Sequence, residues 1–478
     1  MLRPTGIDGF IEHAMTRYYT AGMPEQTSAG ERHDTALPAG ITAIDCLIAD
    51  LNGVMRGKRI APGALPKVLD NGINLPLSVF GTDITGKTVD ATRLGYRTGD
   101  KDGLCRAVAG SLRPVPWTAE PSAQVLLSMY QLDGSPFWGD PRHALARVLE
   151  LFRDLGLAPV VALETEFYLI DPKLDDHGRP GLVCNPVTGK TQRATQVYSI
   201  REIEDFADIV GDITAAAAAQ GLPADAAVAE YAPGQFEINL RHVNDALLAC
   251  DHLLLLRRLI RGVARKHGLD ATFMAKPFAD LAGNGLHAHV SLIDQDGKNV
   301  CAGDGEHGES AILRQGVAGL LDMMGESTLL FSPHANSFRR LQPGSFAPTA
   351  IAWGVNNRTT AIRIPAGRGK AMRLEHRLGS ADANPYLMLA AILAGIHHGI
   401  GRKMDPPAGI RKNAYEQDLP TIPLDWLSAI NAYRESTRLA EYLGPEMHWL
   451  YDTVKRAEFD QFHAEILPLE YEWYLRAT

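Results

Sequence analysis

The stretch VVALETEFYLI at residues 160–170 places two glutamates inside a run of apolar residues. In a β-strand, residues two positions apart point to the same side, so this stretch predicts a strand with Glu164 and Glu166 on one face. Taken alone, such a pair is most often part of the solvated face of a half-buried strand. The pair therefore needs partners from elsewhere in the chain before it indicates a site.

Three further apolar-patterned stretches also place polar side chains on one face of a strand. The stretches are VAEYAPGQFEINL (228–240), GLHAHVSL (285–292) and AMRLEHRLG (371–379). The side chains that share a face are Glu237 with Asn239, His287 with His289 and Ser291, and Arg373 with Glu375 and Arg377. In addition, Glu230 lies at the start of the first of these stretches.

In one sheet, these strands would gather five carboxylates and at least one imidazole. Carboxylates brought so close repel one another and are driven to take up protons unless a cation neutralises them. A set rich in oxygen with one nitrogen suits Mg²⁺ or Mn²⁺ better than zinc. The sequence therefore indicates a site for divalent cations.

Arginines accompany the carboxylates in the second half of the chain. They are Arg339, Arg340, Arg358, Arg363, Arg373 and Arg377. A guanidinium group is a planar, permanently charged clamp for phosphate and carboxylate. Arginines mixed with metal-binding carboxylates suit phosphoryl transfer, where catalysis is mainly positioning and charge stabilisation. The alternative is a solvated surface with ion pairs, which we favour for Arg339.

The composition is that of an ordinary globular protein, with 478 residues of which 45% are hydrophobic. A formal net charge of −9 does not supply the basic field expected of a nucleic-acid binder. No stretch approaches the roughly 20 apolar residues that span a bilayer, and the N-terminus does not match a secretory signal. Five scattered cysteines without CxxC spacing argue for a cytoplasmic protein without disulfides or a zinc site.

The order of strand, turn and helix signals predicts an α+β protein. A leader is predicted over residues 1–40, a small domain over 41–116 and a larger one over 117–478, with the boundary at LRPVPW (112–117). An Asn-Gly signal in ITAIDCLIADLNGVMRGKRI (41–60) predicts a hairpin. Helices are predicted over residues 245–268, 311–324 and 385–400.

Six blocks of the chain resemble the glutamine synthetase family in order and spacing. They are ETEFYL (164–169), EYAPGQFE (230–237), GNGLHAHVS (283–291), RRLQPGSFAP (339–348), NNRTTAIRIP (356–365) and RLEHRLGSADANPY (373–386). The block DLNGVMRGKR (50–59) fits the family's smaller domain. The resemblance implies an ATP-dependent ligase that joins the γ-carboxylate of glutamate to an amine.

The resemblance also implies a role for each matching residue. The implied ligands of a metal beside the substrate glutamate are Glu166, Glu230 and Glu237, and those of a metal on the ATP phosphates are Glu164, His287 and Glu375. The implied glutamate-binding residues are Gly283, Arg340 and Arg377. The implied groups around the γ-phosphate and nucleotide are Arg358, Arg363 and Arg373, with His289 and Ser291 near the adenine. Of these, Arg358, Arg363 and Glu375 are the implied catalytic residues.

The family's architecture and mechanism follow as expectations. The fold would combine a small N-terminal β-grasp-like domain with a catalytic domain built on a curved antiparallel sheet. Active sites would lie between neighbouring subunits of a homo-dodecamer of two stacked hexamers. Glutamate would attack the γ-phosphate of ATP to give γ-glutamyl phosphate and ADP, and an amine would then displace phosphate.

The chain departs from the family pattern at the position that handles the amine. Glutamine synthetases carry a glutamate there that helps to hold ammonium, whereas this chain has Phe346. An aromatic ring cannot supply that charge, so we expect an organic amine, such as putrescine, a polyamine, ethanolamine or a small alkylamine. Asp83 is a candidate for the family's ammonium-site aspartate from the neighbouring subunit, and Tyr415 is interpreted as a surface tyrosine.

Three other functions compete with an organic-amine ligase. The first is a glutamine synthetase with an unusual ammonium site, against which Phe346 argues. The second is a ring-forming homologue without activity, but such a chain would have no physical need to keep paired like charges together. The third is a metal-dependent hydrolase, which would need no nucleotide clamp.

Overall fold

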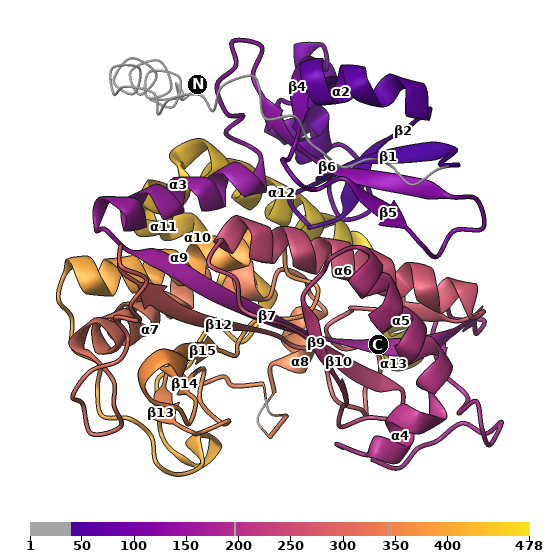
Figure 1. The fold of residues 1–478 in the computed structure, drawn as a ribbon. Coiled ribbons are helices and arrows are strands. Elements are labelled where there is room, and N and C mark those ends of the chain that lie inside the picture. Colours follow the sequence, from indigo (N-terminus) through magenta and orange to yellow (C-terminus); the bar gives the residue numbers. More distant parts are fainter. Residues whose placement is uncertain (1–39, 196, 343, 346) are drawn as a thin grey trace. The chain divides into compact units, whose positions relative to one another are not determined.

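Two β-sheets organise the chain in this computed structural model, the smaller at the top of Figure 1 and the larger below it. The structure describes residues 40–195, 197–342, 344, 345 and 347–478. Apart from Gly40, the predicted leader lies outside the described residues. The fold is α+β, as predicted.

The smaller sheet has six strands in the order β2-β1-β6-β4-β3, with β5 paired to β6. The strands are β1 (Ala43–Ala49), β2 (Met55–Ile60), β3 (Ile73–Pro76), β4 (Asp102–Ala107), β5 (Arg113–Val115) and β6 (Ser122–Tyr130). The predicted hairpin is confirmed, because β1 pairs antiparallel with β2 across the Asn-Gly turn. Gly57 has φ 152°, and a side chain there would collide with the carbonyl of Cys46 on β1.

The last strand of the smaller sheet follows the predicted domain boundary. Although β6 begins at Ser122, after residue 116, it pairs with β1, β4 and β5. The Pro-rich segment before it contains β5, so it belongs to the smaller sheet. We propose that the boundary lies after β6, between Tyr130 and the first residue of α3, Pro141.

The larger sheet has nine strands in the order β13-β14-β15-β12-β7-β10-β9, with β8 and β11 both paired to β7. The strands are β7 (Ala158–Leu174), β8 (Pro180–Leu182), β9 (Ala224–Ala229), β10 (Gln235–Leu240), β11 (Asp270–Thr272), β12 (Leu286–Ile293), β13 (Trp353–Val355), β14 (Ile362–Ile364) and β15 (Leu374–His376). Every pair in the order is antiparallel except β13 with β14. Long β7 thus lies at the centre of the pairing.

Helices pack around the sheets (Figure 1). They are α2 (Leu65–Asn71), α3 (Pro141–Asp154), α4 (Ile200–Asp205), α5 (Ala207–Ala219), α6 (Ala246–Lys266), α7 (Ala311–Phe331), α8 (Ser337–Arg340), α9 (Pro385–Gly401), α10 (Trp426–Glu435), α11 (Thr437–Leu443), α12 (Pro445–Ala464) and α13 (Pro468–Tyr474). The 3₁₀ segments are η1 (Pro62–Ala64), η2 (Leu77–Gly81), η3 (Asp90–Thr92), η4 (Tyr96–Thr98), η5 (Gly369–Ala371) and η6 (Ala414–Glu416).

The three helices predicted from the sequence are confirmed as α6, α7 and α9. Each begins at a polar side chain that accepts a hydrogen bond from a backbone N–H of the first turn, which satisfies a donor that the helix leaves free. The caps are Asp245, Ser310 and Asn384. Within the described ranges, none of the helices combines the length and apolar character needed to cross a membrane.

A buried polar network joins the N-terminal region to α12. Lys455 is fully buried and donates hydrogen bonds to Asn52 (2.5 Å) and Glu458 (2.8 Å). Glu458 also accepts from the side chain of Asn52 (2.9 Å) and from the backbone N–H of Ile84 (2.8 Å). A buried carboxylate of this kind depends on its cation, because the charge has left water.

We expect the variant Lys455→Met to lower the free energy of unfolding by about 3–5 kcal/mol, because it strands a buried carboxylate. Urea unfolding of the purified chain measures this loss. The exposed Lys190→Met is the control and should change stability little. Equal stability of Lys455→Met and the wild type would show that the network does not hold the two regions together.

Candidate active site

The register of the larger sheet brings the predicted polar residues together. Directly opposite residues of paired strands project to the same face. The opposite pairs are Glu237 with Glu166, Glu164 with His287, and Glu375 with both His289 and Arg363. The four stretches singled out in the sequence thus form neighbouring strands, and their polar side chains form one cluster.

Two groups within this cluster have the spacing of metal ligands. Ligand atoms of Glu164, His287 and Glu375 lie within 4.8 Å of one another, and so do those of Glu166, Glu237 and His287. Nδ1 of His287 lies 3.8 Å from Oε2 of Glu164 and 4.0 Å from Oε1 of Glu375. His287 therefore stands between the two groups.

The carboxyl groups on the β10 side are compensated only in part, because the charges of Arg358 and Arg377 lower the pKa of Glu230 against larger opposing effects. Burial raises the pKa of Glu237 well above its usual value, and the charges of Glu164, Glu166 and Glu230 raise it further. Burial and the charge of Glu166 likewise raise the pKa of Glu230 to about 8. These groups become fully ionised at neutral pH only if a cation joins them. The donor set therefore fits a divalent ion.

The carboxyl groups on the β12 side are compensated by neighbours. Burial alone would raise the pKa of Glu164, but the neighbouring imidazoles of His287 and His289 lower it below its usual value. Nε2 of His289 lies 3.0 Å from Oε1 of Glu164, while Nδ1 of His289 accepts from Nε of Arg373 (3.1 Å). Burial and the charge of Arg377 lower the pKa of His287, which keeps a nitrogen lone pair free at pH 7.

Glu375 is clamped between two arginines. Arg363 donates from Nη1 to Oε2 (2.6 Å), and Arg377 donates from Nη1 to Oε1. Burial works in the opposite direction, but Arg377 and the nearby histidines and Arg363 lower the pKa of Glu375 to about 2. The carboxylate is ionised, and both guanidinium groups are held at the edge of the cluster.

A short loop before β12 holds the opposite edge of the cluster. The backbone N–H of Gly285 donates to Oε2 of Glu166 (2.6 Å), and the N–H of Glu166 donates to the carbonyl of Gly285 (3.0 Å). A Cβ atom on Gly285 would lie 2.8 Å from Nη2 of Arg340 and 3.1 Å from Nε2 of His287. A side chain at this position would therefore push against the functional groups of Arg340 and His287.

The same loop is anchored by Asn284, which is fully buried. Its side-chain amide donates to the carbonyl of Met274 (2.9 Å), and its oxygen accepts from Gln235 (3.0 Å). Gly283 packs against Arg340, whose Cγ would be 2.8 Å from an added Cβ. Sequence analysis singled out Gly283 but missed Asn284 and Gly285, although both lie inside the GNGLHAHVS block.

Arg340 lies inside the site rather than on the surface. It is 4% exposed and donates from Nη1 to the carbonyl of Leu378 (3.2 Å). Burial lowers the pKa of Arg340, and the charge of Glu166 acts in the opposite direction. A buried guanidinium beside the carboxylates is positioned to receive an anionic group of a substrate.

Tyr415 is not the surface tyrosine expected from the sequence. Its hydroxyl is buried without a hydrogen-bond partner among the described residues. Burial raises the pKa of Tyr415, while the charges of Arg340 and Arg377 lower it, so the hydroxyl lies within electrostatic range of the two arginines. The sequence could not predict this proximity, because Tyr415 lies far along the chain from Arg340 and Arg377 and comes near them only in the folded protein.

Three predicted residues differ from the rest of the cluster in exposure or contacts, and a fourth lies outside the described residues. Arg358 is exposed, although its charge acts on Glu230. Ser291 is half-buried two residues beyond His289 on β12. The carboxylate of Asp83 accepts from the backbone N–H groups of Thr85 (2.9 Å) and Lys87 (3.0 Å) in its own turn. Phe346 lies outside the described residues.

Comparisons with known proteins identify relatives along almost the whole chain. Residues 138–474 match the family described as "Glutamine synthetase, catalytic domain". The chain is 41% identical over 470 residues to gamma-glutamylputrescine synthetase PuuA of Escherichia coli (strain K12), covering 98% of both chains. It is 33% identical to a gamma-glutamylethanolamide synthetase of Streptomyces coelicolor, covering 95% of this chain and 99% of that relative.

Solved structures show the same fold. A structure described as "Apo GmaS without ligand" matches with a TM-score of 0.80 at 30% identity, covering 92% of this chain and 97% of that one. A second, described as "GmaS/ADP complex-Conformation 1", has the same TM-score and identity and covers 91% of this chain and 97% of that one. The predicted glutamine synthetase-like fold is thus confirmed.

We expect Gly285→Ala to lower kcat/KM of the enzymatic reaction at this site by about 100-fold. A displacement of functional groups by about 1 Å can cost that much. The added methyl group would push against Arg340 and His287. Steady-state kinetics measures the loss. The matched control is Gly325→Ala on α7, where an added Cβ meets open space. If both variants keep wild-type activity, Gly285 does not position the cluster.

We expect Glu237→Gln to remove most of the stabilisation that Mg²⁺ gives the protein, without destabilising the metal-free chain. The change removes a cation ligand and one of the repelling charges together. At free Mg²⁺ about 100-fold above Kd, the wild type should gain about 2.7 kcal/mol. Thermal unfolding with EDTA and with Mg²⁺ measures both effects, with the exposed Glu435→Gln as control. An undiminished gain in Glu237→Gln would contradict the assignment.

Proposed function

The chain belongs to the glutamine synthetase family, and we propose that it uses ATP to join the γ-carboxylate of glutamate to an organic amine. The observation that carries this proposal is the cluster of carboxylates and imidazoles on one face of the larger sheet, edged by arginines. The names of relatives that make γ-glutamyl amides, and a similar structure described as an ADP complex, support it.

The chemistry explains why such a cluster is needed. A carboxylate must be activated before an amine can attack it. The γ-carboxylate of glutamate attacks the γ-phosphorus of ATP, so that γ-glutamyl phosphate forms and ADP leaves. The neutral amine then attacks the acyl carbon, phosphate leaves, and the amine loses its proton. Positioned positive charge stabilises the transferring phosphoryl group.

The arginines would fall into two groups, one that binds glutamate and one that binds the nucleotide. Arg340 and Arg377 would hold the carboxylates of glutamate, because Arg340 is buried beside Glu166 and Arg377 is held by Glu375. Arg358, Arg363 and Arg373 would surround the γ-phosphate and the nucleotide, with His289 and Ser291 on the adenine side. Clamping by Glu375 orients Arg363 before the substrate arrives, which reduces the reorganisation that the reaction requires.

Two sets of residues would hold divalent cations, either Mg²⁺ or Mn²⁺. The first set is Glu166, Glu230 and Glu237, and the second is Glu164, His287 and Glu375. Bound there, the cations supply charge that neutralises the phosphates and the crowded carboxylates. In the structure His287 also lies within reach of Glu166 and Glu237, so it is the residue that links the two sets.

The amine is proposed to be organic because the sequence lacks a charge where glutamine synthetases hold ammonium. The residue at that position is Phe346, and an apolar ring favours an alkyl chain over an ion. The two relatives named above carry putrescine and ethanolamide in their names, which supports the same class of substrate. The choice between putrescine, polyamines, ethanolamine and a small alkylamine depends on the assay below.

The family's quaternary arrangement forms part of the proposal. We infer a cytoplasmic homo-dodecamer of two stacked hexamers, in which Asp83 of one subunit reaches the amine site of the next. In the single chain the carboxylate of Asp83 accepts hydrogen bonds from Thr85 and Lys87 of its own turn. These bonds would fix the position of the carboxylate when it faces the amine site of the next subunit.

We expect phosphate release to require ATP, glutamate and an organic amine together, with ammonium a poorer substrate than the best organic amine. A panel of putrescine, spermidine, ethanolamine, methylamine and ammonium measures kcat/KM for each. Phe346→Glu should raise turnover of ammonium relative to organic amines, because it restores the missing charge. Phe346→Leu is the apolar control.

Ammonium used at least as well as every organic amine would contradict the proposed substrate class while leaving the ligase reaction intact. Phosphate release without glutamate would instead point to a hydrolase. The two parts of the proposal therefore fail in separate ways.

A further inference from the structure

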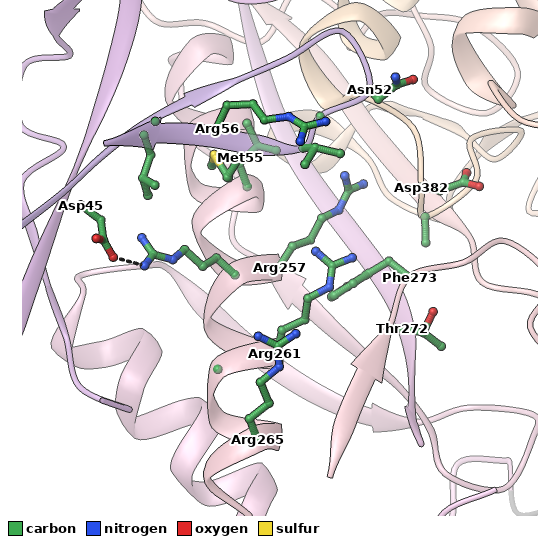
Figure 2. A pocket seen from close by; sticks show the side chains of 18 of the residues that line it. Asp45, Asn52, Met55, Arg56, Arg257, Arg261, Arg265, Thr272, Phe273 and Asp382 are labelled. Carbon is green, nitrogen blue, oxygen red and sulfur yellow. Dashed lines mark hydrogen bonds and ion pairs between the residues drawn. The ribbon is translucent and has the colours of Figure 1, made fainter. Parts of the chain in front are cut away.

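A cavity lies between the β1–β2 hairpin and α6, and Figure 2 shows side chains that line it. Its volume is about 1140 Å³, and its walls come from β2, α6, the segment Thr272–Met274 and the segment Ala381–Asp382. Its lining contains none of the proposed metal ligands. It is therefore a separate site.

The lining of this cavity is strongly basic in a chain whose net charge is −9. Eight lysine and arginine side chains line it against two carboxylates, Asp45 and Asp382. Asp45 is already occupied, because Arg59 (2.6 Å) and Arg258 (2.5 Å) both pair with it. Three other cations pair with carboxylates outside the lining: Arg56 with Asp50, Arg265 with Asp270 and Lys266 with Asp212 (2.8 Å). The deficit of negative charge therefore falls on the cations that remain.

Arg257 shows this deficit most clearly. It is 6% exposed, and its Nη1 donates to the carbonyl of Ala383 (2.9 Å). Its Nε and Nη2 atoms are buried without a hydrogen-bond partner in the described part of the chain. Burial and the neighbouring Arg261 lower the pKa of Arg257 to about 9, although Asp382 acts in the opposite direction. Buried donors left unpaired are costly, so this guanidinium lacks an acceptor.

Three arginines form a ladder along one side of α6. Figure 2 shows Arg257, Arg261 and Arg265 leaving the helix in succession, with Arg56 approaching from the hairpin. Residues four apart on a helix are neighbours separated by about 6 Å along the axis. Arg265 pairs with Asp270 at 3.7 Å, whereas Arg261 lies over the ring of Phe273 at 4.9 Å. The Nη2 atom of Arg56 is buried and has no hydrogen-bond partner among the residues that the structure describes, although its Nε pairs with Asp50 (2.9 Å).

We propose that this cavity is a second binding site, for a small oxyanion that carries at least two negative charges. Guanidinium groups bind phosphate and carboxylate oxygens through paired hydrogen bonds, and the ladder repeats this group at intervals of about one helical turn. An anion with charges at two points would satisfy Arg257 and Arg261 together. Phosphate oxygens and carboxylate oxygens share this chemistry.

The cavity shares a wall with the candidate active site. Thr272 and Met274 line the cavity, and the carbonyl of Met274 accepts the hydrogen bond that anchors Asn284 in the glycine loop. Asp382 lies on the chain segment that also carries Glu375 and Arg377. An anion bound to the ladder would therefore lie next to the two segments that carry these residues, Thr272–Met274 and Ala381–Asp382.

Isothermal titration of the full chain with pyrophosphate and with succinate, at constant ionic strength in EDTA, tests the site. EDTA removes the cations through which phosphate would bind at the active site. We expect at least one probe to bind the wild type, and the better one identifies the phosphate or the carboxylate source. Arg261→Gln should weaken binding by about 10- to 100-fold, the loss expected for one charge-assisted hydrogen bond.

Two controls separate the cavity from other sources of binding. Arg153→Gln removes an exposed positive charge from α3 and should bind like the wild type. Arg373→Gln removes a charge from the candidate nucleotide site and should also keep the binding. The proposal is overturned if neither probe binds the wild type, if Arg261→Gln binds as tightly as the wild type, or if Arg373→Gln alone abolishes binding. Arg261 is exposed to the cavity, so its variant should fold.

Discussion

Mutual repulsion among crowded, partly buried carboxylates is the constraint on which the rest of the structure depends. Glu166, Glu230 and Glu237 crowd one side of the cluster, and burial and neighbouring charge raise the pKa of the last two. On the other side histidines and arginines compensate for Glu164 and Glu375. This imbalance of charge leaves a site for cations. The pairing of the adjacent strands β14, β15, β12, β7 and β10 holds the charged groups in place.

Strand register converts this constraint into function. Alternation along each strand selects one face, and antiparallel pairing sets Glu166 against Glu237 and Glu164 against His287. Backbone hydrogen bonds with Gly285 then fix the edge of the cluster where glutamate is proposed to bind. The position of the functional groups therefore depends on this loop, where a side chain at Gly285 would displace Arg340 or His287.

Local sequence patterns predicted most of this arrangement, and failed where distant contacts decide. The facing of Glu164, Glu237 and Glu375 follows from strand periodicity, and three long helices follow from their caps and apolar spacing. The position of Tyr415 near the arginines, and the pairing of β6 with β1, depend on contacts between segments far apart in the chain. The basic cavity was missed for the same reason, because hairpin and helix form it together.

The central claim is that the carboxylate cluster holds divalent cations against the phosphates of a nucleotide. Equilibrium dialysis of the purified chain against Mn²⁺, with and without ADP, tests it most directly. The account predicts that a chain with an intact cluster binds two Mn²⁺ ions at saturation. One of the two should bind more tightly when ADP is present. A chain that binds no Mn²⁺ under either condition would contradict it.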